Sequence, residues 1–274
     1  MRLLTLNTHS LVEENYSEKL SIFVKAVAEI KPDIIALQEV NQSSDKKQIT
    51  APVRFFPPDK KTIVREDNHA LNIVKMLSDI GINYHWSYKN IKKGYDIYDE
   101  GISLLSLSPI TFTDCFTVSR GDDYEDWKTR KILGIKVKDN PDDTFFSVHY
   151  GWWDDDDDSF FNQWLITLEK LRKYRSVWLM GDFNNPAEIE NEGYSLISKS
   201  GFYDSYQKAQ IKDDGITVDR IIDGWRDRIK KSKDGMRLDQ IWSTKPHKIK
   251  SHRVIFDGEN YPVISDHFGV IIEI

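Results

Sequence analysis

The run GDFNNP (residues 181–186) follows the apolar segment SVWLM directly and places an acid and an amide two residues apart. Side chains at i and i+2 of an extended segment point the same way, so Asp182 and Asn184 are expected to face one site above the strand end. The alternative is an Asx turn, in which these side chains bond their own backbone. Only the rest of the chain can decide between the two interpretations.

Polar side chains also adjoin other apolar runs that are typical of buried strands. They are Asn7 after LLTL, Glu39 after DIIALQ, His149 after TFFSV, and Asp266 with His267 before FGVIIEI. Loops at one end of layered sheets lie close together, so these side chains are expected to converge in one acidic pocket that contains histidine.

The oxygen ligands in this set favour a hard cation. Glu39, with Asp266 and Asn7 near it, offers the ligand types that Mg²⁺ or Mn²⁺ prefers. Cys115 is the only cysteine and histidines are few, which argues against zinc. A divalent cation held by carboxylates and completed by substrate phosphate oxygens is the usual arrangement for phosphoryl transfer.

Phosphoryl transfer also needs groups that aim water at phosphorus and groups that neutralise the developing charge. Asp182 and His267 are candidates for the first task. His149, Asn184 and Asn7 fit the second. Asp239 lies in RLDQIW, a run of buried character, where a carboxylate needs a partner such as histidine.

The apolar patterns predict the elements that must position these residues. Helical spacing favours helices over Tyr16–Ile30, up to a stop at Gly81, and over residues 159–173, with a long loop at residues 41–67. Strand-like runs outnumber the helices, which favours two packed sheets flanked by helices over a repeating βαβ arrangement. No linker rich in Pro, Gly or Ser divides the 274 residues, so we expect a single domain over residues 1–274.

Composition and charge exclude several classes. A net charge of −6 argues against a protein that grips a long phosphate backbone, so a nucleic-acid partner is not expected. The N-terminal run MRLLTLNTHS lacks a signal-peptide cleavage site, and no apolar run has the length of a membrane helix. A cytoplasmic protein without a membrane partner is expected, and the sequence leaves its oligomeric state open.

Six motifs, in order along the chain, resemble those of the endonuclease/exonuclease/phosphatase superfamily: LLTLNTHS, DIIALQEV, SVHYGWW, GDFNNP, RLDQIW and SDHFGV. This superfamily includes DNase I-like nucleases, inositol polyphosphate 5-phosphatases and bacterial sphingomyelinases. The resemblance implies a four-layer α/β sandwich, with two face-to-face mixed β-sheets flanked by helices. It also implies direct attack by water without a covalent enzyme intermediate.

The resemblance implies roles for the metal-binding and water-activating residues. Glu39 would be the principal metal ligand, with Asn7 beside it and Asp266 near the metal. Asp182 would position or deprotonate the attacking water. Asn184 would hold a phosphate oxygen.

It also implies roles for the histidines. His149 would donate to the phosphate or help to protonate the leaving oxygen. His267 would contact the phosphate in the transition state, and Asp239 would bond its far nitrogen to fix tautomer and charge.

The substrate must be inferred from the segments around the motifs. Trp152 and Trp153 precede five aspartates (residues 154–158) on a loop expected to border the pocket. Aromatic rings beside carboxylates suit a neutral sugar, whereas an acidic rim repels DNA. The alternatives are a solvated acidic loop and tryptophans that only pack in the core. Arg130 is a further candidate for substrate phosphate, although an Arg at a strand start is often only a surface charge.

The segments around these motifs, together with TVDRIIDGWRDRI (residues 217–229), are similar to one branch, the bacterial maltose 6'-phosphate phosphatases. That branch implies a small phosphorylated sugar as substrate. The run at residues 217–229 itself shows little apolar periodicity and predicts an ordered surface loop.

Three other functions compete with a sugar phosphatase. Lysine clusters at residues 91–94 and 229–235 would suit a nuclease, but such clusters are commonly solvated faces. A secreted sphingomyelinase would carry an export signal and an apolar hairpin, and neither is evident. A catalytically inactive scaffold would have lost a motif residue, yet none of the motif positions is replaced.

Overall fold

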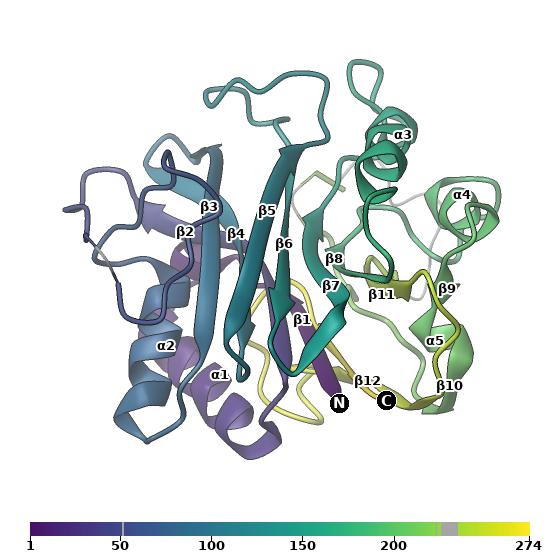
Figure 1. The fold of residues 1–274 in the computed structure, drawn as a ribbon. Helices are drawn as coiled ribbons and strands as arrows, with labels where there is room; N and C mark the ends of the chain where they lie inside the picture. Colours follow the sequence, from purple (N-terminus) through teal and green to yellow (C-terminus); the bar gives the residue numbers. More distant parts are fainter. Residues whose placement is uncertain (51, 223, 226–234) are drawn as a thin grey trace.

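The structure is a computed structural model that describes residues 1–50, 52–222, 224–225 and 235–274. Two β-sheets of seven and six strands lie face to face, and helices cover their outer faces (Figure 1). Both sheets are mixed, because each contains parallel and antiparallel pairs. The four-layer α/β sandwich expected from the sequence is confirmed.

The first sheet has the strand order β10-β12-β13-β1-β2-β4-β3. Its strands are β1 (Arg2–Asn7), β2 (Ile34–Ser43), β3 (His85–Gly94), β4 (Tyr98–Ser106), β10 (Ala209–Lys212), β12 (Ile249–Ile255) and β13 (Gly269–Glu273). The second sheet has the order β5-β6-β7-β8-β11-β9. Its strands are β5 (Ile110–Thr117), β6 (Lys131–Val137), β7 (Asn140–His149), β8 (Val177–Asp182), β9 (Tyr203–Asp204) and β11 (Asp239–Ser243).

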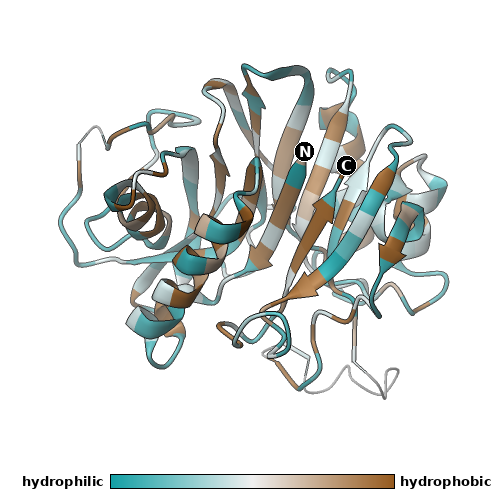
Figure 2. Cartoon of the chain, turned by 90° about the horizontal axis from the view of Figure 1, so that it is seen from below, coloured by the Kyte–Doolittle hydropathy of each residue, from teal (hydrophilic) through white to brown (hydrophobic). Residues whose placement is uncertain are grey.

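The helices pack amphipathic faces on the sheets. They are η1 (Ser10–Val12), α1 (Tyr16–Ile30), α2 (His69–Asp79), α3 (Phe160–Leu171), α4 (Gly193–Lys199) and α5 (Ser205–Lys208). Hydrophilic and hydrophobic bands alternate along them (Figure 2). The first helix has the bounds expected from its apolar spacing, and α2 ends just before Gly81, whose φ of 82° suits a glycine at a helix stop.

Three apolar layers hold these elements together. Side chains of both sheets, such as Leu3 and Ile34 from one and Phe145 and Trp178 from the other, form the central layer. A second layer lies between the first sheet and α1 and α2. A third lies between the second sheet and α3 and α4. The central layer fixes the two sheets relative to each other, so residues at their strand ends can form one site.

The strands that carry the polar motifs lie at the centre of each sheet. Strand β1 pairs with β2 in parallel, and β7 pairs with β8 in parallel. The carboxyl ends of two parallel strands meet at the same edge, which brings their last residues together. The chain ends also meet, since the Met1 ammonium donates to the carbonyl oxygen of Ile274 at 3.2 Å (Figure 1). No helix in the described ranges has the length and apolar content that crossing a membrane requires.

Two sequence-based expectations about loops are wrong. Strand β2 runs on to Ser43, so the loop expected from residue 41 begins later. The run at residues 217–229 is not merely a surface loop, because Val218, Ile222 and Trp225 are buried with Trp152 in a small apolar cluster. Its scattered apolar residues show no period because they follow an irregular backbone. Residues 223 and 226–229 lie outside the described part of the chain.

Candidate active site

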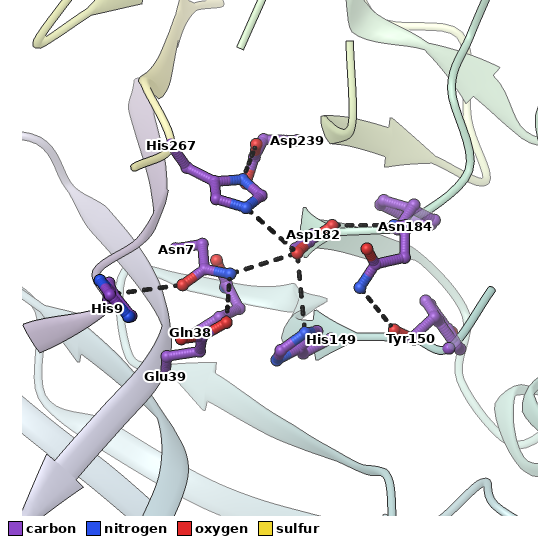
Figure 3. A network of polar contacts seen from close by, with 12 residues as sticks. Asn7, His9, Gln38, Glu39, His149, Tyr150, Asp182, Asn184, Asp239 and His267 are labelled. Atoms are coloured by element: carbon purple, nitrogen blue, oxygen red, sulfur yellow. Dashed lines mark hydrogen bonds and ion pairs between the residues drawn. The ribbon is translucent and has the colours of Figure 1, made fainter. Parts of the chain in front are cut away.

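The polar residues singled out by the sequence meet where the central strands of both sheets end (Figure 3). Strand pairing sets His149 beside Asp182, and Asp182 in turn beside Asp239. Asn7 is the last residue of β1 and pairs with Gln38 of the adjacent strand β2. The expected convergence is therefore present, and backbone register produces it directly.

Gly181 allows β8 to reach this point. Its φ is 150°, and a Cβ atom there would lie 2.0 Å from the carbonyl oxygen of Val148. Any other residue would push β7 and β8 apart where His149 and Asp182 must come together. The glycine in GDFNNP thus permits the close approach of the two strands.

Asp182 is at the centre of the site and is only 1% exposed. Its Oδ2 accepts from Asn7 Nδ2 at 3.2 Å, and its Oδ1 accepts from the backbone N–H of Asn184 at 2.8 Å. Burial raises the pKa of Asp182 to about 6, and the charge of Asp239 adds to this, while His267 opposes it. A carboxylate with a pKa near neutrality can both accept and release a proton.

His267 is held by Asp239. Its Nδ1 donates to Asp239 Oδ2 at 2.8 Å, which leaves Nε2 directed at Asp182 Oδ2, 3.9 Å away (Figure 3). Burial lowers the pKa of His267, but the charges of Asp239 and Asp182 outweigh it and hold this pKa well above the usual value. His267 is therefore cationic at neutral pH.

His149 has the opposite charge state. Its Nε2 lies 3.6 Å from Asp182 Oδ2. Burial, together with the charges of Arg130, Lys92 and His267, lowers the pKa of His149 well below the usual value. His149 therefore contacts Asp182 as a neutral imidazole, and the two side chains do not form an ion pair. Different surroundings give the two histidines different charges.

A bulge in β2 presents Glu39. The pairing of β2 with β4 shifts register between Leu37 and Val40, and Glu39 adopts a φ of 50°. The sequence placed Glu39 at the strand end, which is wrong, because β2 continues beyond it. An extra residue in a strand re-aims a side chain. Here it brings Glu39 Oε1 to 2.9 Å from Asn7 Nδ2.

The charges around Glu39 fit a cation. Loss of water contact and the negative charges of Glu100 and Asp266 raise the pKa of Glu39 to about 7. A bound divalent cation would remove the repulsion among these carboxylates, and their oxygens are hard ligands. Asn7 joins Glu39 to Asp182 through its amide nitrogen, and its Oδ1 accepts from the backbone N–H of His9 at 3.3 Å.

Two groups of ligand atoms in the described chain lie close enough together to hold a metal, and Glu39 belongs to neither. Asp182, Asp239 and His267 form one, and His9, Glu13 and Asp266 form the other. The first group could bind an ion, but His267 already bonds Asp239, and Asp182 accepts from Asn7 and Asn184. The second is joined by His9 Nδ1 and Glu13 Oε1 at 2.7 Å. The oxygen-rich surroundings of Glu39 fit a hard cation better.

Asn184 does not follow β8 as an extended residue. Its φ is 49°, and its backbone N–H bonds Asp182, so the Asx turn is present. The side chain nevertheless points toward the site, with Nδ2 donating to the carbonyl oxygen of Tyr150 at 2.9 Å (Figure 3). Trp225 Nε1 donates to Asn184 Oδ1 at 3.0 Å. The turn and the site are therefore compatible, because the turn fixes the amide.

Two cations, Arg130 and Lys92, line the same cavity as His149. Arg130 immediately precedes β6 and is only 4% exposed, and its guanidinium lies over the ring of Trp152 at 6.0 Å. Its Nε has no hydrogen-bond partner, and no carboxylate in the described ranges forms an ion pair with its side chain. Lys92 is also buried, but it pairs with Glu100 at 3.2 Å.

These residues line one cavity of about 380 Å³. Of the side chains expected from the sequence, it contains Glu39, Arg130, His149, Trp152, Asp182, Asn184, Asp266 and His267. Asn7 and Asp239 support the cavity through their hydrogen bonds to Asp182 and His267.

Trp153 and the acidic run do not line this cavity, contrary to expectation. Trp153 packs against Phe161 instead. Within the run, Asp155 accepts backbone N–H groups of residues 157 and 158 and pairs with Lys128 at 3.0 Å. Asp155, Asp157 and Asp158 are therefore bound within their own loop and to Lys128 and Arg120 of a neighbouring loop.

Sequence reasoning missed several lining residues. Lys92 was assigned to a solvated lysine cluster, yet it is buried in β3 and donates to the carbonyl oxygen of Trp127 at 2.7 Å. Glu100 in β4 and the rim residues His9 and Tyr95 were not singled out. Charged residues within strand-like runs were the available signal. The second lysine cluster, at residues 229–235, lies outside the described residues except for Gly235.

Comparisons with known proteins agree with this geometry. The model of the endonuclease/exonuclease/phosphatase family matches residues 4–267. A solved family protein from Leptotrichia buccalis C-1013-b is 32% identical with a TM-score of 0.88, and the match covers 100% of this chain and 98% of that chain. No curated protein matches.

More distant solved structures share the fold. A mannosyl-6-phosphatase from Bacteroides thetaiotaomicron is 18% identical with a TM-score of 0.67, covering 100% of this chain and 98% of that chain. A 3'-5' exonuclease from Neisseria meningitidis is 18% identical with a TM-score of 0.63, covering 100% of this chain and 99% of that chain. The family model spans nearly the whole sequence, and the protein from Leptotrichia buccalis is 32% identical to it. The chain therefore belongs to the endonuclease/exonuclease/phosphatase family.

Proposed function

We propose that this chain is a Mg²⁺-dependent phosphomonoesterase that releases phosphate from a phosphorylated sugar, of the maltose 6'-phosphate type, by direct attack of water. Arg130 carries the proposal. Among the described residues the buried Arg130 guanidinium forms no ion pair, which is costly, and a phosphate group in the cavity would supply negative charge through paired hydrogen bonds. The cavity volume of about 380 Å³ is suited to a small ligand.

The charge states of the side chains suggest a division of roles. Asp182, with a pKa of about 6, would orient the attacking water and take its proton. Cationic His267 would stabilise the negative charge that develops on the phosphate oxygens. Neutral His149 would donate a hydrogen bond to the phosphate. Asn184 uses one amide hydrogen for Tyr150, and its second would bond a phosphate oxygen.

Glu39 and Asp266 would hold the divalent cation, with Asn7 beside them and Mn²⁺ as a possible substitute for Mg²⁺. When bound, the cation would act as a Lewis acid that polarises the phosphoryl group. Arg130 and Lys92, which line the same cavity, would bind the phosphate oxygens. Asp182 lies beside His149 and His267 in that cavity, so the water that it orients would approach the ester from there.

A sugar phosphate is favoured over DNA by charge. The chain carries a net charge of −6, and a polynucleotide would need cationic contacts well beyond one phosphate. The fold is shared with a mannosyl-6-phosphatase and with an exonuclease, so both substrate classes belong in the test. A sphingomyelinase-type diesterase is the third alternative, and a catalytically inactive scaffold the fourth.

The deciding experiment measures phosphate release with Mg²⁺, Mn²⁺ or EDTA. The substrates are maltose 6'-phosphate, glucose 6-phosphate, a nucleoside monophosphate, an inositol phosphate and sphingomyelin, with plasmid nicking measured in parallel. Asp182→Ala serves as the inactive control. Metal-dependent release that is selective for the sugar phosphates supports the proposal. Nicking without monoester hydrolysis would assign the chain to the nucleases and refute it.

A further inference from the structure

The rim of the catalytic cavity carries two aromatic side chains that the phosphate chemistry does not use. Trp127 is 54% exposed and Tyr95 is 48% exposed, and both line the same cavity as Arg130 and His149. Tryptophan and tyrosine are usually largely buried, so two exposed rings on the wall of one cavity are informative. Their position indicates a surface that a ligand covers.

Trp127 is anchored by its backbone and by its neighbours, and although the Lys128 ammonium lies 5.6 Å from the centre of its ring, the residue is largely exposed. Its carbonyl oxygen accepts from Lys92 Nζ at 2.7 Å, which connects its backbone to the cationic side of the cavity. Its ring packs against the ring of Trp152 with centroids 5.9 Å apart, and Trp152 lies in turn under the guanidinium of Arg130. The ring is thus fixed close to the proposed phosphate position, and it is still about half exposed.

Tyr95 lies at the rim of the cavity with a left-handed backbone conformation that tyrosine rarely adopts. Tyr95 and Asp96 adopt φ values of 50° and 61° in the tight turn between β3 and β4, where Ile97 N–H donates to the Gly94 carbonyl oxygen at 3.2 Å. Gly and Asn normally occupy such positions, and a bulky residue there is uncommon. The Tyr95 hydroxyl lies 3.1 Å from His9 Nε2, so its ring is also held in place.

We propose that Trp127 and Tyr95 form the subsite for the leaving group, and that this group is a pyranose ring. The inference rests on the proposed function and identifies the part of the cavity that binds the sugar. A pyranose has an apolar C–H face that can cover the exposed face of Trp127. Its hydroxyl groups can bond the Tyr95 hydroxyl and the Lys93 ammonium, both of which line the cavity, while His9 holds the Tyr95 hydroxyl in place.

A nucleobase would also stack on Trp127, but it fits the surrounding polar groups less well. The Lys93 ammonium and the Tyr95 hydroxyl match hydroxyl groups distributed around a sugar ring. A base has its polar atoms on its edges only. The sequence predicted that Trp153 would contact the sugar. We instead assign this contact to Trp127, whose exposed ring lines the cavity.

The test compares phosphate monoesters with and without a sugar ring. Steady-state kinetics with Mg²⁺ are measured for glucose 6-phosphate, maltose 6'-phosphate and glycerol 2-phosphate, which has no ring. We expect Trp127→Ala to raise KM for the two sugar phosphates about tenfold, with kcat nearly unchanged. The KM for glycerol 2-phosphate should change less than about twofold.

Three variants control for other effects. Trp127→Phe keeps an aromatic face and should retain most of the sugar preference. Tyr95→Asn keeps a residue that tolerates the turn and should lose part of the preference with the fold intact. Phe112→Ala removes an aromatic side chain that is 42% exposed but does not line the cavity, and it should behave as wild type.

Two kinetic outcomes would overturn the subsite. One is an equal loss by Trp127→Ala on the sugar phosphates and on glycerol 2-phosphate. The other is a larger loss on a nucleoside monophosphate than on the sugar phosphates, which would indicate a base platform. In both cases metal-dependent hydrolysis of glycerol 2-phosphate by the wild type would leave the proposed phosphatase function standing.

A binding measurement separates the two proposals if no monoester is hydrolysed. Maltose is titrated into the metal-free protein, and tryptophan fluorescence is recorded for the wild type and for Trp127→Phe. A saturable change in the wild type that is mostly lost in the variant supports the subsite, whatever the activity. No change in the wild type, or the same change in both proteins, would refute it.

Discussion

Asp239 and His267 form a buried pair, with Oδ2 of the acid 2.8 Å from Nδ1 of the ring. The side chains are 0% and 3% exposed. Because Nδ1 is occupied, only Nε2 can face Asp182 and the cavity. The pair therefore fixes the tautomer, the orientation and the positive charge of His267.

We expect Asp239→Asn to reduce kcat by about 10²- to 10⁴-fold, because the amide no longer holds His267 cationic and correctly oriented. KM should change little, since Asp239 does not line the cavity. Kinetics and thermal unfolding are measured together. A variant with near-normal kcat would show that His267 needs no partner.

Removal of the charge of Arg130 should affect stability and activity in opposite directions. Arg130→Met deletes a buried cation that forms no ion pair with any described residue, so the free energy of unfolding should rise by about 1–3 kcal/mol. Phosphatase activity should fall sharply, and inorganic phosphate should stabilise the wild type but not the variant. Urea unfolding with and without phosphate checks both effects. A less stable variant would mean that Arg130 is already neutralised in the folded protein.

The carboxylates around Glu39 should make stability depend on Mg²⁺. At a hundredfold excess over its Kd, the cation should raise the free energy of unfolding of the wild type by about 2.7 kcal/mol. Glu39→Gln should abolish this response and should slightly stabilise the metal-free protein, because repulsion with Glu100 and Asp266 is relieved. Thermal unfolding with Mg²⁺ or EDTA is the measurement. An unchanged response in the variant would place the cation elsewhere.

His252 should make the fold sensitive to acid. Burial and the charge of Arg237 lower its pKa to about 3, and neither ring nitrogen has a hydrogen-bond partner among the described residues. Between pH 6.5 and pH 3 the unfolded chain binds the proton and the folded chain does not, so stability falls as the pH falls.

For the wild type this should amount to about 2–3 kcal/mol between pH 7.5 and pH 4.5 from His252 alone. His252→Leu should remove this loss of stability at low pH. The separate contribution of His69, whose pKa burial also lowers to about 3, should remain. Chemical denaturation at the two pH values tests this. Identical losses in the wild type and the variant would contradict it.

The sequence determined much of this protein. Apolar periodicity was sufficient for α1, for the strand runs and for two packed sheets with outer helices. Residue chemistry at strand ends was sufficient to single out Asp182, His149 and His267 as candidates that would converge. These features depend on local spacing and on the general packing of layers, which single segments encode.

The tertiary structure decided the rest. The bulge that turns Glu39 into the site depends on pairing with β4, which no local pattern reveals. The opposite charges of His149 and His267 arise from neighbours distant in sequence, including Arg130 and Asp239. Trp127 lines the cavity and Trp153 does not. Both residues lie on irregular loops, so the direction of their side chains does not follow from the alternation of an extended strand. Side-chain environment is a property of contacts between remote segments, so only the folded molecule defines it.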